Sequence, residues 1–197
     1  VARPDYEEMV AERLARRTAT ASSDWFPVFK ARYGMQVAFE AVRDELGDGA
    51  VATQLLTCCT AVDPILVAGL EPVYSEISRA TAAIDPERLE APERLRAVVL
   101  QHTYGIIDGT TSRSLRRRAH DAGAVLVEDC AHCVGRMARA ADGSPLADVS
   151  VHSFGVEKML DSHFGGAVWV NPDSPFRGLV GALRRRLAAL PRLSGRL

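Results

Sequence analysis

The chain has 197 residues, a formal net charge of −1, 47% apolar residues and 25% charged residues. This composition is that of a folded globular protein, and it excludes wholesale disorder, a collagen-like repeat and a coiled coil. The near-neutral charge excludes a global attraction to nucleic acid or to an anionic membrane. Because no apolar run approaches the length of a membrane span and the acidic start lacks a signal-peptide core, we expect a cytoplasmic protein.

The first quarter of the chain has a helical pattern. Residues 5–19 form an amphipathic, charged stretch, and residues 20–33 are typical of a connection. Residues 34–46 again show apolar side chains at helical spacing and stop at Gly47. We therefore expect an N-terminal helical segment over residues 1–24 and a second helix that opens at residue 34.

From residue 51 onward, short apolar runs alternate with helix-like stretches. The runs predict strands at 51–56, 72–77, 96–101, 124–128, 148–154 and 166–170. The stretches between them predict helices at 60–69, 86–95, 110–122 and 177–190. Such alternation is typical of βαβ units, so we expect an α/β fold with three α/β/α layers around a mostly parallel central sheet. In these sheets, ligands bind beyond the carboxyl ends of the strands.

Chemically active side chains follow the predicted strands. Asp129 comes directly after the run at 124–128, Ser153 lies at the end of the next run, and Lys158 follows it; the only other lysine is Lys30. A lysine in a cleft of low dielectric loses its proton easily and can form a Schiff base. A buried aspartate needs a cation beside it, which a protonated pyridine nitrogen supplies. Together with donors for a phosphate, these groups are what pyridoxal phosphate requires.

Several stretches resemble motifs of the DegT/StrS-type sugar aminotransferases, which are pyridoxal-phosphate enzymes of fold type I. The core motifs are Val-Glu-Asp-Cys-Ala-His at 127–132, Ser-Phe-Gly-Val-Glu-Lys at 153–158 and His-Phe-Gly-Gly-Ala at 163–167. Further stretches match in the same order at 57–65, 69–74 and 101–105, and the resemblance runs from about residue 30 to about residue 171. It implies that residues 25–190 are the cofactor-binding large domain, with a truncated tail at 191–197 and the family's small C-terminal domain missing.

The resemblance implies a role for each matching residue. Lys158 would form the Schiff base and then move the substrate proton, and Asp129 would keep the pyridine nitrogen protonated. His132 matches the position that lies against the cofactor ring, and Ser153 matches one that binds the phosphate.

Two matches depart from the family pattern. Gly34, Met35 and Gln36 would open a helix whose N–H groups hold the phosphate, but Met35 replaces a residue that usually carries a hydroxyl. Cys58 stands where the family usually has an aromatic residue that stacks on the cofactor ring.

The implied reaction is the transfer of an amino group from glutamate or glutamine to a keto sugar, with the sugar linked to a nucleotide. Relatives that remove a hydroxyl instead carry a histidine in place of Lys158, so the lysine favours amino transfer. Family members are dimers of about twice this length, so we expect this chain to be a fragment of a longer, homodimeric protein.

Three alternatives remain open. The chain could be a catalytically idle cofactor-binding module that acts through protein contacts. Cys130-x-x-Cys133, with His132 between them and the Cys58–Cys59 pair elsewhere, could hold zinc or act in redox chemistry, although adjacent cysteines rarely offer both thiolates to one metal. The arginine runs at 116–118 and 184–186 could bind a phosphate-rich partner, although such runs are usually solvated helix faces. We expect no metal, no nucleic acid and no membrane partner.

Overall fold

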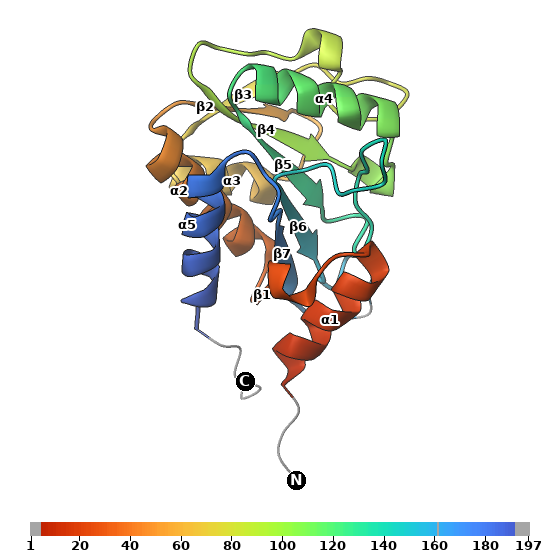
Figure 1. Cartoon of the computed structure of the whole chain (residues 1–197). Coiled ribbons are helices and arrows are strands. Elements are labelled where there is room, and N and C mark those ends of the chain that lie inside the picture. The colour runs from red at the N-terminus through yellow and green to blue at the C-terminus, as the bar shows by residue number, and fades with distance from the viewer. Residues whose placement is uncertain (1–4, 161, 192–197) are drawn as a thin grey trace.

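The computed structural model describes residues 5–160 and 162–191, whose arrangement is shown in Figure 1. In this part of the chain, seven strands form one sheet with the order β1-β7-β6-β5-β4-β2-β3. The strands are β1 (Trp25–Val28), β2 (Ala50–Gln54), β3 (Glu71–Ser75), β4 (Leu95–Gln101), β5 (Val125–Cys130), β6 (Val149–Ser153) and β7 (Gly166–Val170). The strands from β3 to β6 pair in parallel, and only β7 and β1 run antiparallel to their neighbours. The predicted mostly parallel sheet is therefore confirmed.

Helices cover both faces of the sheet (Figure 1). They are α1 (Tyr6–Thr18), α2 (Ala31–Leu46), α3 (Cys59–Val67), α4 (Gly109–Asp121) and α5 (Arg177–Ala188). One core packs α2, α3 and α5 against one face of the sheet. Two other cores pack α4 and α1 against the opposite face. These three layers agree with the predicted α/β/α architecture.

Alternation along the strands sorts their side chains between the two faces. On β5, Val125 and Val127 belong to the core under α2, whereas Leu126 belongs to the core under α4. Because side chains of a strand point alternately to opposite faces, Asp129 continues the α2 side. Glu128 and Cys130 continue the α4 side by the same rule. All six residues of β5 are buried, as the apolar run at 124–128 indicates.

Besides the start of the second helix, which lies at Ala31 and not at residue 34, two expectations about secondary structure are wrong. Residues 25–28, expected in a connection, form β1, which is ordered by antiparallel pairing with β7. The expected helix at 86–95 is a single 3₁₀ turn at Pro86–Arg88 followed by irregular chain. Asp85 caps that turn, and Pro92 disfavours helical geometry in the residue before it, so the turn does not propagate.

The ends of the chain lie partly outside this description. The predicted helix at 5–19 is present as α1, where the Asp5 carboxylate accepts hydrogen bonds from the N–H groups of Glu7 and Glu8. Of the predicted tail at 191–197, residues 192–197 lie outside the described residues. Among the described helices, none is both long and apolar enough to span a membrane.

Candidate active site

A cavity of about 250 Å³ lies at the carboxyl ends of β4, β5 and β6. The predicted site residues that line it are Met35, Cys58, Asp129, His132, Ser153 and Lys158. They come from α2, the start of α3, two strand ends and the two loops that follow those strands. This is the edge of the sheet at which the parallel topology predicts a ligand.

Asp129 occupies the floor of the cavity. The residue is 7% exposed, and its Oδ1 accepts a hydrogen bond of 2.9 Å from the N–H of Ala131. Burial raises the pKa of Asp129, and this outweighs the Ala131 hydrogen bond and the nearby His102, His132 and Lys158, which lower it. A cationic donor in the cavity would therefore stabilise the ionised form of this carboxylate.

Lys158 and His132 meet above this floor. The Lys158 Nζ lies 3.3 Å from His132 Nε2, and the lysine side chain is 17% exposed. On the other side of the ring, His132 Nδ1 accepts a hydrogen bond of 3.1 Å from the N–H of Tyr104. We therefore assign the proton of the neutral ring to Nε2, from which it can be donated to a neutral amine.

The turn after β4 packs closely against His132. Tyr104 has a left-handed backbone with φ of 56°, and its ring stacks on His132 at 6.4 Å between centroids. Gly105 follows with φ of 76°, and a Cβ there would lie 2.7 Å from the His132 carbonyl oxygen. Strained conformations of this kind gather at functional sites because the surrounding structure must enforce them.

Ser153 and Cys58 also line the cavity. The Ser153 hydroxyl accepts a 3.4 Å contact from the N–H of Gly155 and is otherwise turned to the cavity that Lys158 also lines. Cys58 is the N-cap residue of α3, and its Sγ accepts a hydrogen bond of 3.2 Å from the Thr60 hydroxyl. That bond lowers the pKa of Cys58, with a smaller contribution from Lys158. Cys58 therefore presents an acidified thiol to the cavity.

The predicted phosphate cradle at 34–36 needs correction. The helix α2 begins at Ala31, so the N–H of Gly34 already bonds the Lys30 carbonyl within the first turn. Gly34 allows close packing instead, since a Cβ there would lie 2.5 Å from a methyl group of Val168. Gln36 donates to Glu40 one turn later in the helix. Of the three predicted residues, only Met35 lines the cavity.

Further residues of the cavity wall were not among the predicted site residues. Lys30 and Arg32 make its rim basic, and His163, Thr57 and Gln101 add polar groups. The Gln101 amide is fixed by donation to the Leu56 carbonyl and to the Thr103 hydroxyl, and its Oε1 accepts from Thr57. The sequence could have pointed to Gln101, because this residue ends the apolar run at 96–101 just as Asp129 follows the run at 124–128. In the structure, the two residues pair in register on neighbouring strands.

The structure does not bring together the cysteines and the histidine that the zinc alternative assumed. His132, between Cys130 and Cys133 in sequence, faces Lys158 instead. A different histidine, His102, groups with the two buried cysteines. Cys58 and Cys59 are exposed and lie at the start of α3, outside that group.

Three of the six arginines in the two basic runs pair with acids, and one of these pairs is Arg118 with Glu87. Arg184 binds Asp24, and Arg186 binds both Glu40 and Asp44. These contacts favour the view that the run at 184–186 is a solvated helix face.

Comparison with known proteins places this geometry in context. A model of the DegT/DnrJ/EryC1/StrS aminotransferase family matches residues 28–177. The L-glutamine:2-deoxy-scyllo-inosose aminotransferase of Streptomyces lividus is 29% identical over 160 residues, which are 80% of this chain and 37% of that protein. The GDP-perosamine synthase of Vibrio cholerae is 28% identical over 170 residues, which are 85% of this chain and 44% of that protein.

Solved structures show the same relationship. The structure of DesI in the presence of its TDP-sugar product has a TM-score of 0.74 and 27% sequence identity, and the match covers 93% of this chain and 44% of that one. The chain thus spans less than half the length of these relatives. Because the family match extends over most of its residues, the chain belongs to the DegT/DnrJ/EryC1/StrS aminotransferase family.

Proposed function

We propose that this chain is the cofactor-binding part of a pyridoxal-phosphate-dependent aminotransferase that transfers an amino group to a keto sugar. The observation that carries the proposal is the meeting of Lys158 and Asp129 in one cavity, from loops and strands far apart in sequence. Membership of the family supports it. The relatives' names, which include an inosose aminotransferase and a perosamine synthase, support a cyclic keto compound as the acceptor.

The cavity fits the proposed cofactor at its floor. Asp129 is a buried carboxylate whose pKa is raised by burial, so it favours a partner that brings a proton or a positive charge. A pyridine nitrogen meets that requirement, and the bound cofactor would then withdraw electrons from the substrate carbon. Asp129 would hold this nitrogen in its protonated form.

Lys158 and His132 would carry out the transfer of the substrate proton. A neutral amine at Lys158 Nζ can accept a proton from the substrate carbon and return it to another atom. His132 faces the same Nζ with a protonated Nε2, held in that tautomer by the N–H of Tyr104. His132 would therefore hold the Lys158 amine in one place within the cavity.

The phosphate would lie at the basic rim. Ser153 offers a hydroxyl, and Arg32 offers a guanidinium from the first turn of α2. Arginine is well suited to this task because its planar fork can bind two phosphate oxygens at once. Met35 and Cys58 would complete the wall beside it. This arrangement replaces the predicted cradle at 34–36.

The finer features of the function rest on the relatives' names. Glutamine as amino donor is supported by the printed name of the inosose aminotransferase, with glutamate as the other candidate. A nucleotide-linked sugar is supported by the name of the GDP-perosamine synthase and by the TDP-sugar product of DesI. We propose the same donor and acceptor classes here.

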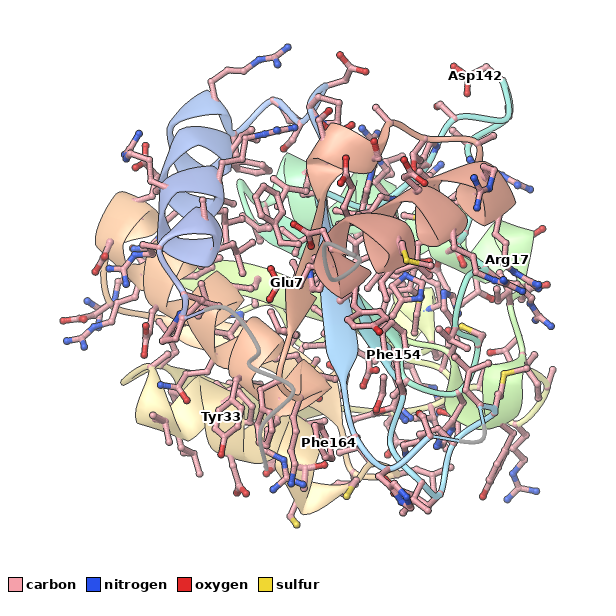
Figure 2. All side chains as sticks on the ribbon, turned by 90° about the horizontal axis from the view of Figure 1, so that it is seen from below. Glu7, Arg17, Tyr33, Asp142, Phe154 and Phe164 are labelled. Carbon is pink, nitrogen blue, oxygen red and sulfur yellow. The ribbon has the colours of Figure 1, made fainter. Side chains whose placement is uncertain are left out.

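We also propose that the full protein is a homodimer in the cytoplasm. An exposed aromatic cluster beside the cavity supports self-association: Phe29 packs on Tyr33 and on Phe164. Tyr33 and Phe164 lie on the same side of the molecule in Figure 2. The four free cysteines support a reducing compartment.

Titration with pyridoxal phosphate tests the proposal. The chain should develop the absorption band of a lysine-bound cofactor, and Lys158→Ala should abolish that band while Lys30→Ala retains it. A chain that stays colourless would contradict the cofactor assignment.

The amino donor separates an active enzyme from an idle module. Adding L-glutamine or L-glutamate to the coloured protein should convert the bound aldehyde cofactor to its amine form. A band that no donor changes would favour the cofactor-binding module without transfer activity.

A further inference from the structure

A second group of reactive side chains lies on the other side of the strands that carry the cavity floor. His102 follows β4, Cys130 ends β5, and Cys133 lies in the loop after it. The three side chains are at most 1% exposed, and one ligand atom from each lies within 4.8 Å of the others. Within the described part of the chain, no other histidine, cysteine or acidic residues form such a group.

Against the expectation of no metal from the sequence, we propose that His102, Cys130 and Cys133 form a binding site for one zinc ion. The donor set is two sulfurs and one imidazole nitrogen, which selects borderline and soft metals over magnesium or calcium. Tetrahedral zinc places its sulfur and nitrogen ligands about 3.4–3.8 Å apart. The observed separations, all within 4.8 Å, would contract to this range when the ion binds.

Glu128 orients the histidine for this role. Its Oε1 lies 2.7 Å from His102 Nε2, so that nitrogen is engaged and Nδ1 is left for a metal. The carboxylate is itself held by the N–H of Ala138 at 2.6 Å and by the Ser150 hydroxyl. A carboxylate behind a metal-bound histidine is the usual arrangement in zinc proteins, where it fixes the ring and raises its basicity.

The two cysteines are held together by a turn. The N–H of Cys133 donates to the Cys130 carbonyl at 3.0 Å, which closes the chain between them. Zinc would displace the protons of both thiols, and the two thiolates would balance its charge in a buried place. The Arg136 carbonyl oxygen, 3.9 Å from Cys133 Sγ, or a water is available as the fourth ligand.

The proposed ion would influence the cavity from the opposite face of the sheet. His132 lies between the two cysteines in sequence and reaches Lys158 on the other side. Fixing Cys130 and Cys133 to one ion would therefore fix the loop that presents His132. Of the three proposed ligands only His102 also lines the cavity, so zinc binding can be measured without the cofactor.

Cobalt titration tests the site directly. The reduced chain, purified without a histidine tag, should bind one equivalent of Co²⁺ with a thiolate-to-cobalt charge-transfer band, and zinc should displace it. Cys133→Ser should lose the band, whereas Cys59→Ser, which changes an exposed cysteine, should keep it. Zinc should also raise the melting temperature of the parent chain but not of Cys133→Ser.

A second variant distinguishes the loss of a metal ligand from the loss of folding. His102→Gln retains a donor for Glu128 and removes the imidazole ligand, so it should fold yet bind cobalt at least tenfold more weakly. The proposal is overturned if the parent chain shows no cobalt band with both thiols reduced. It is equally overturned if Cys133→Ser or His102→Gln binds cobalt as the parent does, or if Cys130 and Cys133 are recovered as a disulfide that cannot be reduced in the folded chain.

Discussion

Glu128 and Asp129 are consecutive carboxylates on one strand, both are buried, and they face opposite sides of the sheet. Burial would raise the pKa of Glu128, but the hydrogen bond and charge of His102, together with Ala138 N–H and Ser150, bring the pKa below its ordinary value. For Asp129 burial prevails, and the pKa is raised. Glu128 has its hydrogen-bond donors within the fold, whereas Asp129 needs a ligand to stabilise its charge. The contrast teaches that burial alone does not identify a functional acid; the supply of internal donors does.

The largest expected effect is on the free energy of unfolding and follows from the loss of the Glu128 carboxylate. Glu128→Ala removes the partner of a buried histidine whose pKa the carboxylate raises, and it leaves the N–H of Ala138 without its acceptor. Breaking such a buried pair lowers the free energy of unfolding by about 3–5 kcal/mol. Urea unfolding of the variant and the parent chain measures the loss. A difference below about 1 kcal/mol would remove the distinction between the two carboxylates.

Asp129 should behave in the opposite way. Asp129→Asn removes a charge that burial disfavours, so the free energy of unfolding should stay within about 1 kcal/mol of the parent value or rise. Its turnover as a transaminase should fall by about 100-fold or more, because the partner of the pyridine nitrogen no longer carries a charge. Unfolding and donor-driven conversion of the cofactor are measured on the same preparation. Unchanged turnover would contradict the proposed role.

His152 offers a pH test on the side of the sheet that serves the fold. It is buried, its Nδ1 accepts from the N–H of Gly135, and burial lowers its pKa to about 4 despite the nearby Glu128. Between pH 6.5 and 4 the unfolded chain takes up a proton that the folded chain does not, so stability falls as the pH falls. The loss contributed by this residue reaches about 3 kcal/mol.

The variant His152→Gln keeps an acceptor for Gly135 and removes the titration. The difference in free energy of unfolding between parent and variant should therefore change between pH 7 and pH 4 by the amount expected for His152. Parallel stability curves for the two proteins would show that His152 does not titrate as inferred.

The smallest expected effect is at Cys58. The Thr60 hydroxyl lowers the pKa of this thiol, so more of it is thiolate at neutral pH and its alkylation by iodoacetamide is faster. Thr60→Val removes that hydrogen bond and should slow the alkylation of Cys58 a few-fold at pH 7. At a pH above both pKa values the two rates should converge. Equal rates at pH 7 would show that Thr60 does not acidify the thiol.

Much of the sheet could be predicted because its strands are buried on both faces. The runs that became β4, β5 and β7 are nearly continuous apolar segments, which is the pattern of a parallel, fully covered sheet. The strand β1 could not be found in this way. It contains Pro27 and is only 4 residues long, and it is ordered by pairing with β7 rather than by its own sequence pattern.

The candidate site was predictable where it depends on alternation along strands. Asp129 and Ser153 lie at strand ends on the same side, and Lys158 follows one of them. The start of α2 was misplaced because Gly34 suggested a helix opening, although its role is close packing against Val168. The grouping of His102 with Cys130 could not be read from the chain, because it depends on the pairing of β4 with β5.

The central claim is that Lys158 is the residue that holds the cofactor. Borohydride reduction of the chain mixed with pyridoxal phosphate, followed by peptide mass spectrometry, tests it most directly, because only Lys30 offers a second side-chain amine. We predict one equivalent of reduced cofactor on the peptide that contains Lys158 and none on the peptide that contains Lys30. Label on Lys30, or no label on either lysine, would contradict the account.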